Sequence, residues 1–389
     1  MKTLKIVMKP LDAYFLGGER NAAHENSPTQ RTQRNPYLIH SNRMLSQSAA
    51  FGALRYLGIR SPKPSFRLEP EDRANIGAES YQITSEGQKF GKIHCISPVL
   101  LVDRQGQRWM SAPRGRVALP EEQEGKGLYQ PFTSFALVET ALGTRCLPEE
   151  YNEKTAWDGA ELLCLETGAL RGSVFGTQMR TGINRSSQKK ARNGKNQNDG
   201  TPSGYFKKEY VTLDPDFSFL FYAQAEDGFF CRRDGVVYMG QGRTPFAVQV
   251  EEAEKEALAL PPCCCPAAVR VNGEERPCAW AAALSDVYHP GDVNELKQRC
   301  SLMIAEGRSY RTFITKTDAE NSNTRYEKGQ IGLKLIPAGS VFLFLGTEKQ
   351  TPQEQMEEFA AYLKGLSAHA RKAGFNRLCY STAVKCEEE

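Results

Sequence analysis

The C-terminal segment constrains the fold of this chain most, because it carries signals for four successive elements. Two short apolar runs, at residues 331–336 and 341–345, have the length of strands and flank a proline- and glycine-containing turn. Thr351 and Glu354 then form a capping box with proline at the first helical position. The helix that follows has one apolar stripe, made of Met356, Phe359, Leu363 and Leu366. With a final strand at residues 378–384, this order predicts half of a ferredoxin-like unit.

A second strong signal is the run at residues 43–57, which reads as a polar turn leading into a short helix. Ser46 or Ser48 can cap the helix, and Ala50, Phe51, Leu54 and Leu57 share one face at helical spacing. Gly52 costs this helix about 1 kcal/mol relative to alanine, so we expect another backbone to approach it closely. The free N–H groups of the first turn favour a phosphate. An ordinary capped core helix remains the alternative.

Residues 171–222 are predicted to form a long hairpin that carries most of the chain's positive charge. Between its strands, residues 186–204 contain Ala191 as their only hydrophobic residue, so they are not expected to pack alone. Residues 180–210 contain eight Lys and Arg side chains against Asp199 and Glu209, which gives a local net charge of +6. This exceeds the +4 of the whole chain. The segment is therefore a candidate nucleic-acid footprint, or alternatively a solvated loop without a partner.

The remaining composition indicates a globular chain that stays in the cytoplasm. The 389 residues suffice for about two domains, and 40% of them are hydrophobic. The N-terminal residues lack the apolar stretch of a signal peptide, and no window approaches a membrane span. Leu4, Ile6 and Met8 alternate with less apolar residues, which predicts a half-buried first strand.

Eleven cysteines are scattered along the chain, and we expect them to be reduced thiols. Cys263, Cys264 and Cys265 lie between two prolines, but adjacent cysteines do not have the spacing of a tetrahedral zinc site. Adjacent carboxylates such as Glu121 and Glu122 have no accompanying ligand set. The sequence therefore predicts no metal and no cofactor.

Taken in order, four segments of the chain resemble the RAMP superfamily of CRISPR-associated proteins. They are the first strand with its glycine exit at residues 4–18, the serine-led helix at 46–55, the Gly-Ile-x-Arg hairpin at 181–185 with its return at 204–211, and the later glycine turns at 237–243 and 374–376. Within that superfamily the chain is most similar to the type III-B (Cmr) subunits that hold the 5′ end of the guide RNA. The last glycine loop departs from the pattern, because it has only Gly374 where many RAMP proteins have several glycines.

The resemblance implies an α+β fold of two ferredoxin-like (RRM-like) domains packed together, with long loop and hairpin insertions. We place the domains at residues 1–225 and 226–389. It implies binding of the 5′ tag of CRISPR RNA, without catalysis, in an antiviral effector complex. It also implies contact with the large polymerase-like subunit and with the first backbone RAMP subunit.

The residues expected to contact RNA combine cations for phosphates with flat or small groups for unstacked bases. They are Arg20, Arg43, Ser46, Gln47, Ser48, Arg55, Arg180, Gly182, Asn184, Arg185, Lys189, Lys190, Arg192, Tyr205, Gly240, Gly242 and Arg243. Phe15 and Phe206 also lie beside glycines or in the hairpin, and for them core packing is the alternative.

The enzyme alternative is a RAMP endoribonuclease that processes CRISPR precursor RNA. Of the five histidines, His24 is the one candidate base, because it lies in a polar loop with Arg20, Arg31 and Arg34 nearby. A third possibility is the equivalent subunit of another type III subtype.

Overall fold

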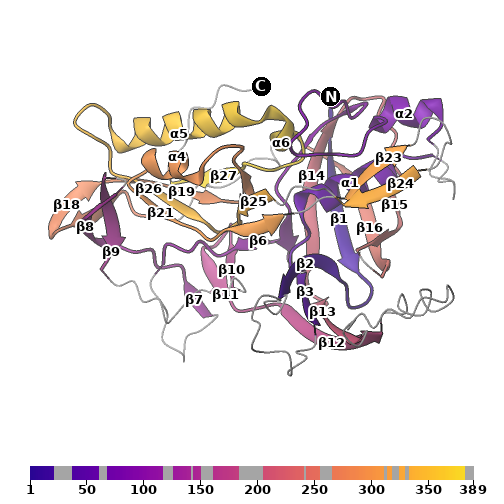
Figure 1. The fold of residues 1–389 in the computed structure, drawn as a ribbon, viewed down its shortest axis with the longest axis horizontal. Coiled ribbons are helices and arrows are strands. Elements are labelled where there is room, and N and C mark those ends of the chain that lie inside the picture. The colour runs from indigo at the N-terminus through magenta and orange to yellow at the C-terminus, as the bar shows by residue number, and fades with distance from the viewer. Residues whose placement is uncertain are drawn as a thin grey trace, which may run out of the picture.

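The computed structural model is an α+β fold built mostly from antiparallel strands with few helices, which confirms the predicted class (Figure 1). The residues that the structure describes are 1–21, 37–60, 68–116, 126–141, 143–149, 161–183, 205–240, 242–254, 265–310, 313–317, 324–328 and 333–381.

The largest sheet has ten strands and is organised around β1 (Lys2–Pro10), which pairs antiparallel with a strand on each side. Leu4, Ile6 and Met8 are buried on one face of β1, which confirms the half-buried first strand. The order is β15 (Asp234–Met239), β16 (Thr244–Ala253), β1, β14 (Ser218–Ala225), β5 (Leu100–Val102), β6 (Arg108–Ser111), β10 (Leu162–Cys164), β11 (Ala169–Arg171) and β7 (Lys126–Leu128), with β4 (Ile93–Ile96) also pairing with β14.

Helix α1 (Gln47–Leu57) covers the buried face of this sheet. Strands β1 and β5 are both antiparallel to β14, which lies between them, so β1, α1 and β5 form a split β-α-β unit. Phe51, Leu54 and Leu57 are buried in the same core cluster as Ile6. The short helix α2 (Pro70–Ile76) begins with a proline in its first turn.

The C-terminal half contains a second four-stranded sheet with two helices along its chain. Its elements follow in the order β-α-β-β-α-β that P-type alternation of a ferredoxin-like unit requires. They are β19 (Ala279–Ala283), α4 (Val293–Gln298), β21 (Leu302–Ile304), β26 (Val341–Phe344), α5 (Pro352–Leu366) and β27 (Leu378–Tyr380), with the sheet order β21-β26-β19-β27. Helix α5 has the predicted capping box, and the short helix α6 (Ala368–Lys372) follows it.

Two expectations about this half need correction. The strand predicted at residues 331–336 forms as β25 (Leu333–Ile336), but it pairs with β20 (Val287–Tyr288) and β22 (Arg308–Tyr310) in a separate sheet and not with β26. The sequence placed the division of the chain after residue 225. Strands β15 and β16 follow that point yet belong to the sheet of β1, so strand pairing moves the division to a point after β16.

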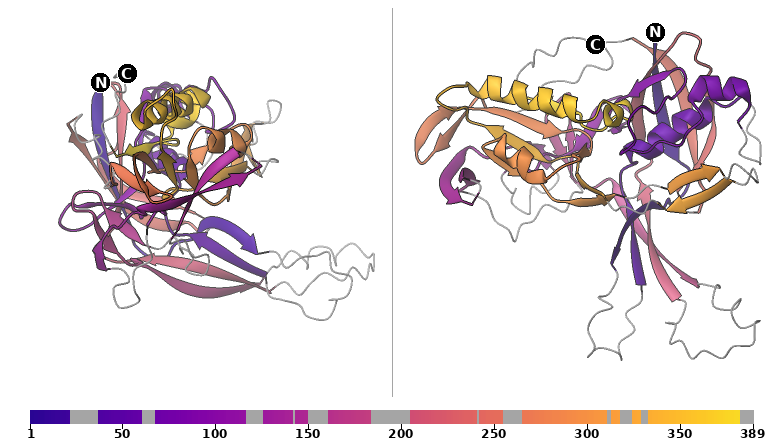
Figure 2. Two further views of the ribbon diagram at one scale, coloured as in Figure 1. Left: turned by 90° about the vertical axis from the view of Figure 1, so that its left-hand side faces the viewer. Right: turned by 45° about the horizontal axis from the view of Figure 1, so that its top comes forward.

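A four-stranded sheet projects from the body of the molecule, as Figure 2 shows. Its hairpin is built from β12 and β13, which pair from Phe175 opposite Leu213 to Ile183 opposite Tyr205. Strand β3 pairs parallel with β13 and antiparallel with β2. The sheet order is β12 (Phe175–Ile183), β13 (Tyr205–Leu213), β3 (Tyr37–Asn42) and β2 (Leu16–Asn21).

Two smaller groups of strands complete the described fold. One is a four-stranded sheet of β18 (Glu274–Pro277), β17 (Ala268–Val271), β8 (Ser134–Thr140) and β9 (Gly143–Pro148). The other is the hairpin of β23 (Phe313–Thr317) and β24 (Thr324–Lys328).

The two halves share a hydrophobic core. Tyr288, Leu335, Ala370 and Phe375 come from the C-terminal half but are buried in the same cluster as β1 and α1. Gln47 adds a polar link, because its amide nitrogen donates to the carbonyls of Ser97 at 3.0 Å and Ala373 at 3.2 Å. A cavity at this junction therefore has walls that are held in place by packing.

Candidate nucleic-acid interface

The base of the projecting sheet carries a cluster of cations and aromatic rings. In the β12–β13 register Arg180 lies directly opposite Lys208, and Gln178 lies opposite Tyr210. Directly opposed residues of an antiparallel pair share one face of the sheet. The alternation of the two strands therefore brings both cations and the tyrosine together.

Each cation of this cluster stands over an aromatic ring. The Arg180 guanidinium carbon is 4.3 Å from the centroid of Tyr210, and the Lys208 nitrogen is 5.3 Å from the centroid of Phe15. The two rings contact each other, with centroids 5.5 Å apart. Such cation–π contacts hold the cationic groups in place while leaving their N–H donors available. We call Phe15, Arg180, Lys208 and Tyr210 the aromatic-cation cluster.

The electrostatics of the cluster favour an anion. Like charges directly opposite each other across a hairpin destabilise it. Arg180 has Asp12 at 3.8 Å and the Gln178 amide oxygen at 3.0 Å, which offset this repulsion only partly. Burial lowers the pKa of Lys208 from its ordinary value. A phosphate between the two side chains would relieve the repulsion.

The glycine turn after β15 packs against this cluster. Gly240 has a φ of 71°, and a Cβ atom there would lie 2.2 Å from the carbonyl oxygen of Phe15. Gly242 has a φ of 122°, and its Cβ position is 3.6 Å from the Tyr210 hydroxyl. Arg243 is exposed and also has a positive φ, at 53°. The structure thus brings the first glycine exit, the hairpin and the later glycine turn to one place.

Two predicted RNA contacts on α1 instead have structural partners. Both ends of the buried Gln47 amide are used, since its oxygen accepts from Val99 N–H at 2.8 Å in addition to the two bonds above. Arg55 donates to the carbonyls of Ile76 at 2.9 Å and Gly77 at 3.1 Å, and burial lowers its pKa to about 10. These side chains tie α1 to neighbouring segments, and an RNA contact by either stays a prediction.

The expected close approach to Gly52 is wrong. Gly52 is exposed, and nothing lies within 4 Å of the position that a Cβ would take. The close backbone contacts of this region occur at Gly58, whose Cβ position is 2.5 Å from a methyl carbon of Ile76. Helix α1 therefore carries a glycine on its solvent face without a packing reason.

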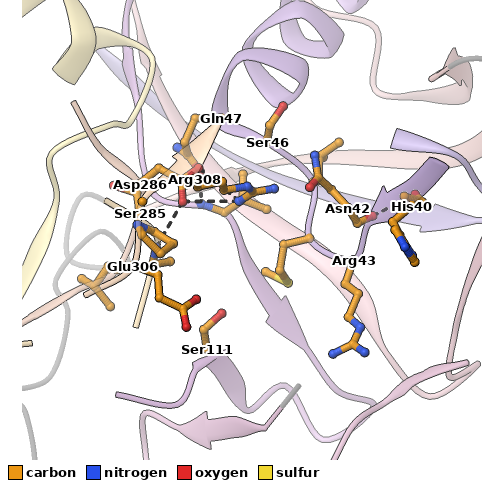
Figure 3. A pocket seen from close by; sticks show the side chains of 18 of the residues that line it. His40, Asn42, Arg43, Ser46, Gln47, Ser111, Ser285, Asp286, Glu306 and Arg308 are labelled. Atoms are coloured by element: carbon orange, nitrogen blue, oxygen red, sulfur yellow. Dashed lines mark hydrogen bonds and ion pairs between the residues drawn. The ribbon is translucent and has the colours of Figure 1, made fainter. Parts of the chain in front are cut away.

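The first turn of α1 opens into a cavity of about 450 Å³ between the two halves (Figure 3). Ser46 caps the helix by accepting from Ala49 N–H at 3.3 Å. Arg43 lies just before the cap, and its carbonyl accepts from the buried Tyr14 hydroxyl at 2.6 Å. The predicted residues Arg43, Ser46 and Gln47 all line this cavity, and Ser48 follows them on the same turn.

Several predicted residues cannot be placed in full. Asn184, Arg185, Lys189, Lys190 and Arg192 lie outside the described residues, as does the candidate base His24. Arg20 and Tyr205 are strand positions in β2 and β13, and Gly182 lies opposite Phe206 in the hairpin. Their roles in RNA binding stay predictions.

Residues that sequence reasoning missed lie in the same area. Tyr210 was not singled out, and Lys208 was counted only for its charge. The signal was present, because Lys208 and Tyr210 are two apart on a strand and so share a face. His40 pairs with Glu209 at 3.3 Å where β3 meets β13, which no local pattern indicates.

Metal and membrane features can be stated for the described part of the chain. It contains no group of three or more His, Cys, Asp or Glu side chains arranged to hold a metal ion. Its eight described cysteines are all free. Among the same residues, no helix is long and apolar enough to cross a membrane.

Comparisons with known proteins give two solved structures. One is a cryo-EM structure of the type III-B Cmr-beta bound to cognate target RNA and AMPPnP, state 1, with 11% identity, 96% of this chain and 95% of that chain covered, and a TM-score of 0.45. The other is the type III-B Cmr-beta bound to cognate target RNA, with 11% identity, 96% of each chain covered and a TM-score of 0.44. No family model matches the sequence, and no curated protein matches it.

Proposed function

We propose that this chain is a non-catalytic RNA-binding subunit of a type III CRISPR RNA-guided effector complex. It holds the 5′ tag of the guide RNA and caps the assembly beside the large polymerase-like subunit and a backbone RAMP subunit. The support in the sequence is the ordered set of segments that resemble RAMP proteins. Antiviral defence is the role that this assignment implies.

The observation that carries the proposal is the aromatic-cation cluster. Arg180 and Lys208 stand directly opposite each other, each over a ring, and the glycine turn at Gly240 abuts them. Single-stranded RNA is bound by cations that follow its backbone and by rings that stack on its bases. The cluster offers both kinds of group, and the basic hairpin segment continues from the strands that carry it.

The test is RNA binding by the double variant Arg180→Gln, Lys208→Gln. Each lost charge-assisted contact should weaken binding about tenfold. The slope of log affinity against log salt should become shallower by about 1.4, since two phosphate contacts on single-stranded RNA are lost. Fluorescence anisotropy with a short repeat-derived RNA at several salt concentrations measures both quantities.

The matched control is the double variant Lys89→Gln, Lys349→Gln, which removes two exposed lysines that lie in loops outside the projecting sheet. It should leave the affinity and the slope near those of the wild type. Equal losses in both double variants would overturn the role of the cluster. Cleavage of the RNA by the wild-type chain would favour the endoribonuclease alternative.

A further inference from the structure

The cavity between the two halves is separate from the aromatic-cation cluster in its walls. One wall is the link between β3 and α1, with His40, Arg43 and Ser46. The opposite wall comes from the C-terminal half, with Ser285, Asp286, Glu306 and Arg308 (Figure 3). Its volume of about 450 Å³ lies within the usual range of small-molecule sites, about 300–1,000 Å³.

The wall at α1 is suited to one phosphate. Among the described residues, none forms an ion pair or hydrogen bond with the Arg43 guanidinium, which Figure 3 shows extending away from the chain. None of them accepts from the backbone N–H of Gln47 or Ser48 in the first turn either. A helix of 11 residues directs its dipole and these N–H groups toward an anion at this end.

The opposite wall is polar but already neutralised. Arg308 pairs with Asp286 at 3.2 Å, and Asp286 also accepts from Ala338 N–H at 3.1 Å. Arg114 pairs with Glu306 at 3.1 Å. These pairs hold the donors and acceptors in position, so this wall can bind the edge of a neutral, hydrogen-bonding group such as a nucleobase.

The charge balance limits the ligand to few negative charges. The lining contains Arg43, Arg114 and Arg308 against Glu209, Asp286 and Glu306. Only Arg43 is without a counter-charge among the described residues, so a triphosphate would meet the three carboxylates with a single cation to offset it. A ligand with one phosphate and one base satisfies both walls.

We infer that this cavity is a binding site for a single nucleoside monophosphate unit, with the phosphate on Arg43 and the α1 N-terminus and the base against the Ser285–Arg308 wall. The unit is either a free nucleotide or one nucleotide of a bound RNA. In taking RNA as one source, the inference depends on the proposed function. The site itself depends only on the cavity.

The experiment is calorimetric titration of the full chain with AMP, GMP, CMP and UMP, and separately with adenosine, inorganic phosphate and ATP. At least one monophosphate should bind saturably and more tightly than its nucleoside, phosphate or triphosphate counterpart. Arg43→Gln should weaken that binding about tenfold or more. The control Arg73→Gln, which alters an exposed arginine on α2, should not change it.

A second variant keeps the test valid if Arg43→Gln lowers stability. Ser111→Phe places a ring in the cavity from β6 and should abolish binding while circular dichroism and the melting temperature stay near the wild-type values. No saturable binding of any monophosphate to the folded wild type, or equal binding by all variants, would overturn the inference.

Competition identifies the source of the nucleotide. If RNA supplies it, the best monophosphate should compete with the repeat-derived RNA for the wild type. If the site takes free nucleotides, RNA affinity should not change at saturating monophosphate. The variant Arg180→Gln, Lys208→Gln should lose RNA affinity but keep monophosphate binding, which separates a failure of the proposed function from a failure of this site.

Discussion

Arg180, Lys208, Tyr210 and Phe15 show how single side chains acquire a function from strand register. Apart, each has an ordinary explanation, since Phe15 is buried and Arg180 is one of many surface cations. Opposed across β12 and β13, the two cations repel each other unless an anion joins them. Gly240 completes the arrangement, because only a residue without a side chain fits against the Phe15 carbonyl.

Gly240→Ala is therefore expected to be more destabilising than a comparable glycine substitution in open space. The left-handed conformation alone costs an alanine about 1–2 kcal/mol. At Gly240 the new Cβ would also lie 2.2 Å from the Phe15 carbonyl oxygen, so the turn must move. Urea unfolding measures the loss of the free energy of unfolding.

The control is Gly87→Ala, which has a φ of 78° like the 71° of Gly240 but no atom within 4 Å of its Cβ position. It isolates the conformational cost. If both substitutions lowered the free energy of unfolding equally, the close packing of the turn on Phe15 would be contradicted.

Local residue patterns predicted which side chains lie on α1 but not what they contact. The capping serine and the buried face at Phe51, Leu54 and Leu57 follow from local spacing, and the structure confirms them. Arg55 was predicted to bind RNA, but its acceptors at Ile76 and Gly77 lie some twenty residues further along the chain. Contacts between segments so distant in sequence leave no periodic signal.

Among the elements, α6 joins the C-terminal half to the N-terminal core through a buried histidine. His369 stacks on Tyr81 with centroids 5.1 Å apart and lies 5.4 Å from the Phe90 centroid. Its Nε2 is 3.0 Å from the Gln88 amide oxygen. Burial lowers the pKa of His369 below its ordinary value of 6.5, with Lys372 acting in the same direction and Glu86 and a bond from the Gln82 backbone opposing it.

This contact predicts a pH dependence of stability. Because the folded state disfavours the charged imidazole, the contribution of His369 is fully present above pH 6.5 and is lost as the pH falls through the lowered pKa. The free energy of unfolding should therefore decrease below about pH 6.5, and His369→Gln should flatten that decrease. Urea unfolding from pH 5 to pH 8 tests it. His94→Gln, at an exposed position, is the control, and a decrease that only this control removed would exclude His369 as the cause.

The elements themselves were largely predictable where capping and periodicity are strong. The helix after Thr351 and the first strand both form as predicted. The partner of the strand at 331–336 was not, because a short apolar run reveals its burial but not its neighbour. Its neighbours β20 and β22 come from separate segments, so β25 pairs outside the sheet that its sequence position suggested.

At the scale of the whole molecule, two halves with a shared core support a projecting sheet and enclose a cavity. The sequence predicted an α+β fold and a basic hairpin, and the structure has both α+β architecture and the hairpin strands. The cavity could not be predicted, because its walls come from residues 40–47 and from residues 284–338. The aromatic-cation cluster and the cavity provide two distinct surfaces for one RNA-binding subunit.

The most direct test of the central claim is to identify the RNA that the chain retains. The chain would be co-expressed with a repeat array and its neighbouring genes and purified, and the 5′ ends of the bound RNA would be mapped. The account predicts one uniform, repeat-derived 5′ end that the isolated chain does not cut. Heterogeneous 5′ ends, or new cleavage by the chain alone, would contradict it.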